Sequence, residues 1–230
     1  MLVAAAVCPH PPLLVPEVGI GLGAEIEELR NLCSQVADDV CAVGADQLFV
    51  VGAAVGVPAQ SFAPWAPGAG AGTVDVPEPL PLPLLVGAHL TGGRRRSFVV
   101  VDPSTDPGEC AELGSELAAS ADRVALLVMG DGSARDDVKA PGYVDPQAPA
   151  WDQTVHNAFQ AADFPALTAL DPTVADELLC TGRAPWQVLA GAATGVALRT
   201  ELAALRVPFG VGYFVARWSL EAGNGASSAN

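Results

Sequence analysis

Short, continuous apolar segments recur along the chain and alternate with longer amphipathic segments. The apolar segments cover residues 2–8, 47–54, 97–102 and 123–131. Each has the length of one strand and lacks polar alternation, which is typical of strands buried on both faces of a parallel sheet. The pattern therefore predicts an α/β fold in three layers, with a mostly parallel central sheet and helices on both faces.

The segments between these runs have the period of amphipathic helices. From Ala24 onward, apolar residues recur every three or four positions, acidic residues occupy the first turn, and Gly44 follows as a stop signal. The same period predicts further helices, and a last apolar run predicts a strand. These helices cover residues 107–121, 148–161, 172–180 and 185–205, and the strand covers 207–218.

Chain length and periodicity predict one domain. A chain of 230 residues, half of them hydrophobic, lies at the upper end of what one core supports. We expect a single domain over residues 1–218 and a disordered tail over 219–230, where periodicity is lost. The proline- and glycine-rich stretch from about residue 55 to 83 predicts a long irregular connection.

Acidic residues dominate the charge of the chain. The formal net charge is −15, which repels phosphate backbones and argues against nucleic acid as a partner. The one dense basic run is Arg94, Arg95 and Arg96, next to two glycines. A solvated turn is the favoured interpretation of this run, and a contact to phosphate or carboxylate is the alternative.

Cysteine usage and the first residues predict a cytoplasmic protein. The five cysteines are odd in number and scattered, without metal-site spacing, as expected for reduced thiols. The initial apolar run is interrupted by prolines after about eight residues, far short of the roughly 20 that span a bilayer. We therefore expect neither export nor a membrane partner, whereas a homo-oligomer remains compatible with the sequence.

Several polar residues directly follow the predicted strands. In mostly parallel sheets, ligands bind beyond the carboxyl ends of the strands. His10, Asp102 and Asp131 leave three of these ends, and Ser133 and Lys139 lie in the loop after Asp131. The sequence therefore predicts a functional site at this edge, with His10 and Asp131 close together.

His10 is the histidine that the fold places best for chemistry. Pro9 and Pro11 restrain the backbone on both sides of it. An imidazole held in this way suits a metal ligand or a general base, and a structural hydrogen bond to a neighbour is an equal alternative. For the other two histidines we favour structural roles: His156 as an ion-pair partner of Asp152, and His89 near a helix end.

Four segments, in this order and spacing, carry a resemblance to a known family. They are AAAVCPHPPLLVPEVG, DQLFVVGAAVG, VALLVMGDGSA and ELLCTGRAPWQVLAGAA. Together they resemble the class III extradiol ring-cleavage dioxygenase superfamily, the group of the protocatechuate dioxygenase catalytic subunit and the Memo proteins. Within that group the chain is most similar to an actinobacterial branch.

The resemblance implies a specific active site. Active members hold Fe(II) through two histidines and a glutamate and use a further histidine as acid and base. His10 matches the first iron ligand. At the position of the second histidine the chain has Ala53 and Ala54, and Ala134 stands where the acid/base histidine is expected.

Two hypotheses follow. In the first, the chain is a degenerate member without cofactor or ring-cleaving activity, which binds a small molecule or a protein partner in the former active-site cleft. His10 and Asp131 then occupy the catalytic positions, and Ser133, Lys139 and Asp102 line the pocket. In the second, the chain is an active non-haem oxidoreductase with a rearranged site, in which His10 and acidic residues bind Fe(II) or another divalent metal.

Overall fold

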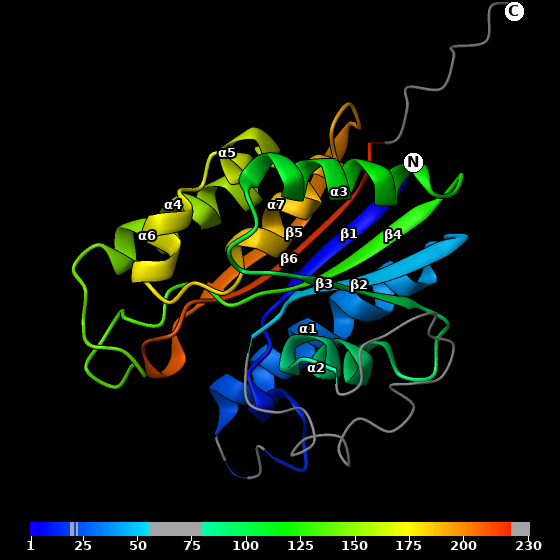
Figure 1. Cartoon of the computed structure of the whole chain (residues 1–230). Helices are drawn as coiled ribbons and strands as arrows, with labels where there is room; N and C mark the ends of the chain where they lie inside the picture. Colours follow the sequence, from blue (N-terminus) through cyan, green and yellow to red (C-terminus); the bar gives the residue numbers. More distant parts are fainter. Residues whose placement is uncertain (19–20, 22, 56–79, 222–230) are drawn as a thin grey trace, which may run out of the picture.

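The structure, a computed structural model, describes residues 1–18, 21, 23–55 and 80–221. The described residues form one six-stranded sheet in the order β3-β2-β4-β1-β6-β5 (Figure 1). The strands are β1 (Leu2–Cys8), β2 (Gln47–Ala53), β3 (Ser97–Val101), β4 (Val124–Met129), β5 (Leu198–Arg206) and β6 (Tyr213–Leu220). Strands β1 to β4 run parallel, whereas β6 is antiparallel to both β1 and β5. The predicted α/β class with a mostly parallel sheet is confirmed.

Helices cover both faces of the sheet (Figure 1). Buried residues of α1 (Ala24–Ala42) and α2 (Leu82–Thr91) pack in one core cluster, on one face. The second cluster, on the other face, takes residues from α3 (Pro107–Ala119), α4 (Ala148–Ala161), α5 (Phe164–Thr168), α6 (Pro172–Glu177) and α7 (Arg183–Ala192). Two short 3₁₀ helices, η1 (Pro12–Leu14) and η4 (Pro208–Gly210), complete the described elements.

Strand β1 shows why the central strands are apolar throughout. Its side chains alternate between the two core clusters: Ala4 and Ala6 belong to the cluster of α1 and α2, and Ala5 and Val7 to the other. All seven of its residues are buried. A strand covered on both faces has no position for a polar side chain, which accounts for the continuous apolar run in the sequence.

An aromatic cluster fixes β6 against α4 and α7. The Phe159 ring lies 5.4 Å from the rings of Trp186, Phe214 and Trp218, in each case edge to face. The indole of Trp218 also donates a hydrogen bond to the Phe159 carbonyl at 3.1 Å. Edge-to-face packing and a satisfied indole N–H favour a single arrangement of these elements, and β6 is thereby held next to β1.

The prediction for the C-terminal third is partly wrong. Helix α7 ends at Ala192, and Leu198–Arg206, predicted as the end of a helix, forms strand β5. The leucines and alanines of this segment have high helix propensity, but pairing along β6 outweighs that local preference. The predicted final strand is also interrupted at its start by η4, where Phe209 has a φ of 62°.

Other predicted boundaries shift by smaller amounts. The predicted helix over 172–180 ends at Glu177, and Leu179 follows with a φ of 55°. Strand β6 continues to Leu220, so residues 219 and 220, predicted as the start of the tail, belong to the sheet, and residues 222–230 lie outside the described residues. Most of the connection predicted over 55–83 lies outside them as well. Among the described residues, no helix is both long and apolar enough to cross a membrane.

Candidate functional site

His10 and Asp131 meet at the carboxyl ends of β1 and β4. These strands are parallel neighbours, and Cys8 at the end of one pairs with Met129 at the end of the other. The His10 backbone N–H donates a hydrogen bond to Asp131 Oδ1 at 2.8 Å, and His10 Nδ1 lies 3.4 Å from the same oxygen. The prediction that these residues share one edge of the sheet is confirmed.

Burial moves both groups toward their neutral forms. His10 is only 5% exposed, and the Asp131 side chain 17%. Burial lowers the pKa of His10, and the Asp131 charge offsets this only in part. Burial likewise raises the pKa of Asp131 against the opposing effect of His10. His10 Nδ1 approaches Asp131 without hydrogen-bond geometry and has no such partner among the described residues.

The segment before α7 holds Asp131 in place. Its backbone carbonyl accepts a hydrogen bond from the Gly182 N–H at 2.8 Å and the thiol of Cys180 at 3.5 Å. The Asp131 N–H donates to Thr181 Oγ1 at 3.4 Å. These contacts fix the position of the loop after β4 and thereby the position of the Asp131 carboxyl group.

Tyr213 is a further neighbour of Asp131 that sequence reasoning missed. It begins β6, the antiparallel neighbour of β1, and is 5% exposed. Burial raises the pKa of the Tyr213 hydroxyl, and the charge of Asp131 adds to this. No motif marks Tyr213, and Cys180 and Thr181 were visible only as part of the segment ELLCTGRAPW.

Ser133 is fully buried and bonded, so it does not line an open pocket as predicted. Its hydroxyl donates to Asp152 Oδ2 at 2.6 Å, and its N–H donates to Asp152 Oδ1 at 2.9 Å. Burial raises the pKa of Asp152 to about 6, against the opposing effect of these two bonds. Asp152 thus bonds to Ser133 and not to His156, whose Nδ1 is buried with no hydrogen-bond partner among the described residues.

Close packing gives the glycines of this edge a structural role. A Cβ at Gly132 would lie 2.6 Å from the Phe214 ring and 2.7 Å from an Asp152 oxygen. A Cβ at Gly182 would lie only 2.1 Å from the Trp186 ring. The GDGS and CTGRAPW segments are therefore needed for the packing of this loop, whatever chemistry the edge performs.

Asp102 and Lys139 do not join His10 and Asp131. The Asp102 carboxylate accepts hydrogen bonds from Ser104 N at 2.8 Å and Ser104 Oγ at 2.7 Å, which makes it a turn residue. Strand β3 is also three strand spacings from β1, roughly 14 Å. Lys139 is exposed and forms no ion pair within the described part of the chain.

The residues present do not fit an iron triad of two histidines and a glutamate. Ala53 ends β2 and is fully buried at the position expected for the second histidine. His89 lies in α2, and His156 in α4. Within the described ranges, no three His, Cys, Asp or Glu side chains could together hold a metal ion.

Comparisons with known proteins bear on the fold and assign no function. No family model matches the chain, and no curated protein sequence matches it. Among solved structures, an uncharacterized protein of Escherichia coli K12, JW3007, matches with a TM-score of 0.53 over 94% of this chain and 99% of its own. Since the two sequences are only 12% identical, this likeness shows that the α/β arrangement occurs in both proteins and assigns no activity to either.

Proposed function

We propose that this chain binds a small, uncharged, hydroxylated molecule at the carboxyl edge of the sheet and does not cleave aromatic rings. The supporting observation is the contact between His10, which is buried, and Asp131, whose side chain is 17% exposed; burial shifts both pKa values toward the neutral forms. An imidazole beside a carboxyl group offers both a hydrogen-bond donor and several acceptors to a ligand hydroxyl.

The buried nitrogen of His10 supports a ligand of this kind. A buried polar atom without a hydrogen bond costs about 1–3 kcal/mol, and His10 Nδ1 has no such partner among the described residues. A hydroxyl that hydrogen-bonds to this nitrogen, as donor or acceptor, would remove that penalty. Burial that disfavours charge also weighs against a divalent cation here, because a cation needs the ionised carboxylate as its ligand.

The second candidate function is metal-dependent oxidation at a rearranged site. It is favoured by the 3.4 Å approach of an imidazole nitrogen to a carboxylate oxygen, since both are common ligands of iron and zinc. Asp102, the other acidic residue considered for this site, is bound in its own turn with Ser104. The metal would therefore depend on two protein ligands, which supports weak binding only.

Metal content and oxygen uptake separate the two functions. Protein purified without chelator is analysed for iron, zinc and manganese, and then assayed for oxygen uptake with catechol and protocatechuate after addition of Fe(II). We expect far less than one metal ion per chain and no uptake above a boiled control. Stoichiometric metal, with oxygen uptake that His10→Ala abolishes, would establish the metal-dependent function instead.

A thermal-shift experiment tests ligand binding itself, with catechol as the probe. We expect catechol to raise the melting temperature of the parent protein, because binding to the folded state stabilises it. The increase should be absent in His10→Ala and retained in His156→Ala, a matched control in α4. Equal shifts in both variants would remove His10 from the binding site.

A further inference from the structure

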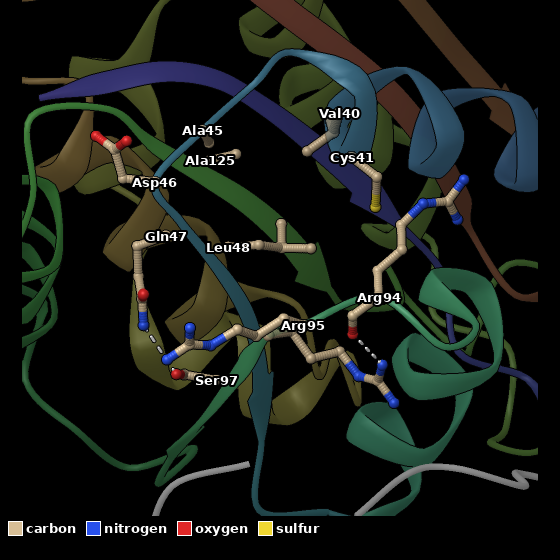
Figure 2. Close-up of a pocket in the computed structure, with 11 residues that line it drawn as sticks. Val40, Cys41, Ala45, Asp46, Gln47, Leu48, Arg94, Arg95, Ser97 and Ala125 are labelled. Carbon is tan, nitrogen blue, oxygen red and sulfur yellow. Dashed lines mark hydrogen bonds between the residues drawn. The ribbon is translucent and has the colours of Figure 1, made fainter. Parts of the chain in front are cut away.

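A second cavity lies at the opposite end of the strands. It has a volume of about 420 Å³ and is bordered by the first residues of β2 and β3, Gln47 and Ser97, and by Cys41 near the end of α1 (Figure 2). The carboxyl edge with His10 and Asp131 is at the other end of the parallel strands. This volume falls in the range of small-molecule sites, roughly 300–1,000 Å³.

Three consecutive arginines line this cavity. Arg94, Arg95 and Arg96 account for three of the 11 lysines and arginines in a chain with 26 acidic residues, whereas Asp46 is the one carboxylate among the lining residues. The run lies in the turn between α2 and β3, but Arg96 is buried, so the prediction of a solvated turn is wrong for this residue. Its arginines, however, surround a concave surface and are not simply spread into solvent.

The three side chains have different roles. Arg96 is buried, donates to the carbonyls of Gly92 and Arg94 at 2.6 Å, and stacks on the Phe98 ring, so it holds the turn in shape. Arg94 forms an ion pair with Asp38 at 2.9 Å in which both side chains are about half exposed. Such a pair contributes little stability, so an incoming anion can compete for Arg94.

Arg95 is the cation available to a ligand. It is exposed and has no ion pair with a carboxylate of the described residues. Figure 2 shows its side chain extending toward Gln47 and Ser97. The Gln47 amide donates to Ser97 Oγ at 2.9 Å, which leaves the hydroxyl proton of Ser97 to donate to a ligand. A guanidinium and a hydroxyl donor together match an oxoanion.

The floor of the cavity is apolar. Val40, Leu48 and Ala125 line it, and Leu48, the most exposed of the three at 9%, offers the apolar contact to a ligand. A ligand that fills the cavity can therefore place an apolar body on this floor while its anionic group meets the arginines, the usual division of a small-molecule site. Inorganic ions would use only the polar half of such a site.

We infer that this cavity, here named the arginine pocket (Gln47, Leu48, Ser97 and Arg94 to Arg96), binds the phosphate or carboxylate group of a small organic anion. Arg95 and Ser97 contact the anionic group, Arg96 holds the turn that presents Arg95, and Leu48 contacts the apolar body. This site is separate from the one proposed for His10 and Asp131, and neither depends on the other.

Calorimetric titration with three probes tests this site: phenyl phosphate, benzoate and inorganic phosphate, at a constant ionic strength of about 0.15 M. We expect saturable binding of phenyl phosphate or benzoate with one site per chain, and the preferred one identifies the anionic group. Inorganic phosphate should bind roughly tenfold more weakly than phenyl phosphate, because it leaves the apolar floor in water.

Substitutions test whether the probe binds in the arginine pocket. Arg95→Gln should weaken binding of the preferred probe at least about tenfold, as expected for a lost charge-assisted hydrogen bond, and Ser97→Ala should weaken it less. Arg199→Gln on β5 removes the same charge from an exposed side chain at the other side of the sheet and should change affinity less than about twofold. Absence of saturable binding by all three probes, or an equal loss in Arg95→Gln and Arg199→Gln, would overturn the inference.

Discussion

The two ends of the parallel strands differ in how they use polar residues. At the carboxyl ends, the carboxyl groups of Asp131 and Asp152 accept hydrogen bonds, and burial shifts the pKa values of both and of His10 toward the neutral forms. At the amino ends, Arg94 and Arg95 are exposed and charged. The contribution of a buried polar group to stability therefore depends on the close packing of its neighbours, whereas that of an exposed charge depends on little around it.

Glycine substitutions should reveal the largest difference in stability between the two ends of the strands. Gly182→Ala at the carboxyl end places a Cβ 2.1 Å from the Trp186 ring, so we expect a loss of about 4 kcal/mol in the free energy of unfolding. Gly93→Ala beside the arginine pocket meets no atom within 4 Å and should change stability by less than about 1 kcal/mol. Urea denaturation measures both values, and similar losses would show that the two ends are equally packed.

The buried carboxyl of Asp152 should make stability depend on pH. Its pKa is raised from 3.8 to about 6 in the folded chain. Its stabilising contribution is therefore complete below pH 4 and is lost as the pH rises through about 6, a change of about 3 kcal/mol. The measurement is the unfolding free energy of the parent minus that of Asp152→Asn, from pH 4 to pH 7.

Asparagine at this position does not titrate, yet it can still accept from the Ser133 N–H. A difference that stays constant over this pH range, or that grows as the pH rises, would contradict the raised pKa.

Asp131→Ala should produce an intermediate effect. It removes the acceptor of the buried His10 N–H, now bonded at 2.8 Å, and an unsatisfied buried donor costs about 1–3 kcal/mol. Asp131→Asn keeps an oxygen at the same place and should restore most of this loss. If Asn is as harmful as Ala in thermal and urea denaturation, the negative charge and not the hydrogen bond is what matters.

Strong local periodicity is what made parts of the fold predictable. Strand β1 and helix α4 have the predicted bounds, because a fully buried strand and an amphipathic helix each leave a clear pattern. Segment Leu198–Arg206 has the composition of a helix and is nonetheless a strand, because its pairing partner β6 lies elsewhere in the sequence. Local patterns cannot indicate such pairing.

The candidate site was predictable only where one rule of topology applied. His10 and Asp131 both follow parallel strands, so the strand-end rule brought them together. Tyr213 reaches the same place from an antiparallel strand, and Thr181 from a helix start, to which that rule does not apply. For the arginine run, the sequence left contact to an anion as the less favoured alternative, because the pocket forms only where the end of α1 and the turn before β3 meet.

The smallest effect is expected at the amino ends. Arg95→Gln should change the free energy of unfolding by no more than about 0.5 kcal/mol, because an exposed side chain without an ion pair contributes little. Urea denaturation at low and high salt checks this value. A loss above about 1 kcal/mol would mean that Arg95 supports the fold and that its substitution cannot be used to test binding alone.

The protonation and metal response of His10 tests the proposed function most directly. NMR titration of the His10 imidazole, assigned by comparison with His10→Gln, gives its pKa and the effect of one equivalent of Zn²⁺ added at neutral pH. We predict a pKa below 6.5, because burial lowers the pKa of this imidazole. We also predict that Zn²⁺ leaves the ring signals unchanged. A pKa above 6.5, or a His10 signal that shifts fully at one equivalent of Zn²⁺, would contradict a metal-free site in which burial lowers the pKa of His10.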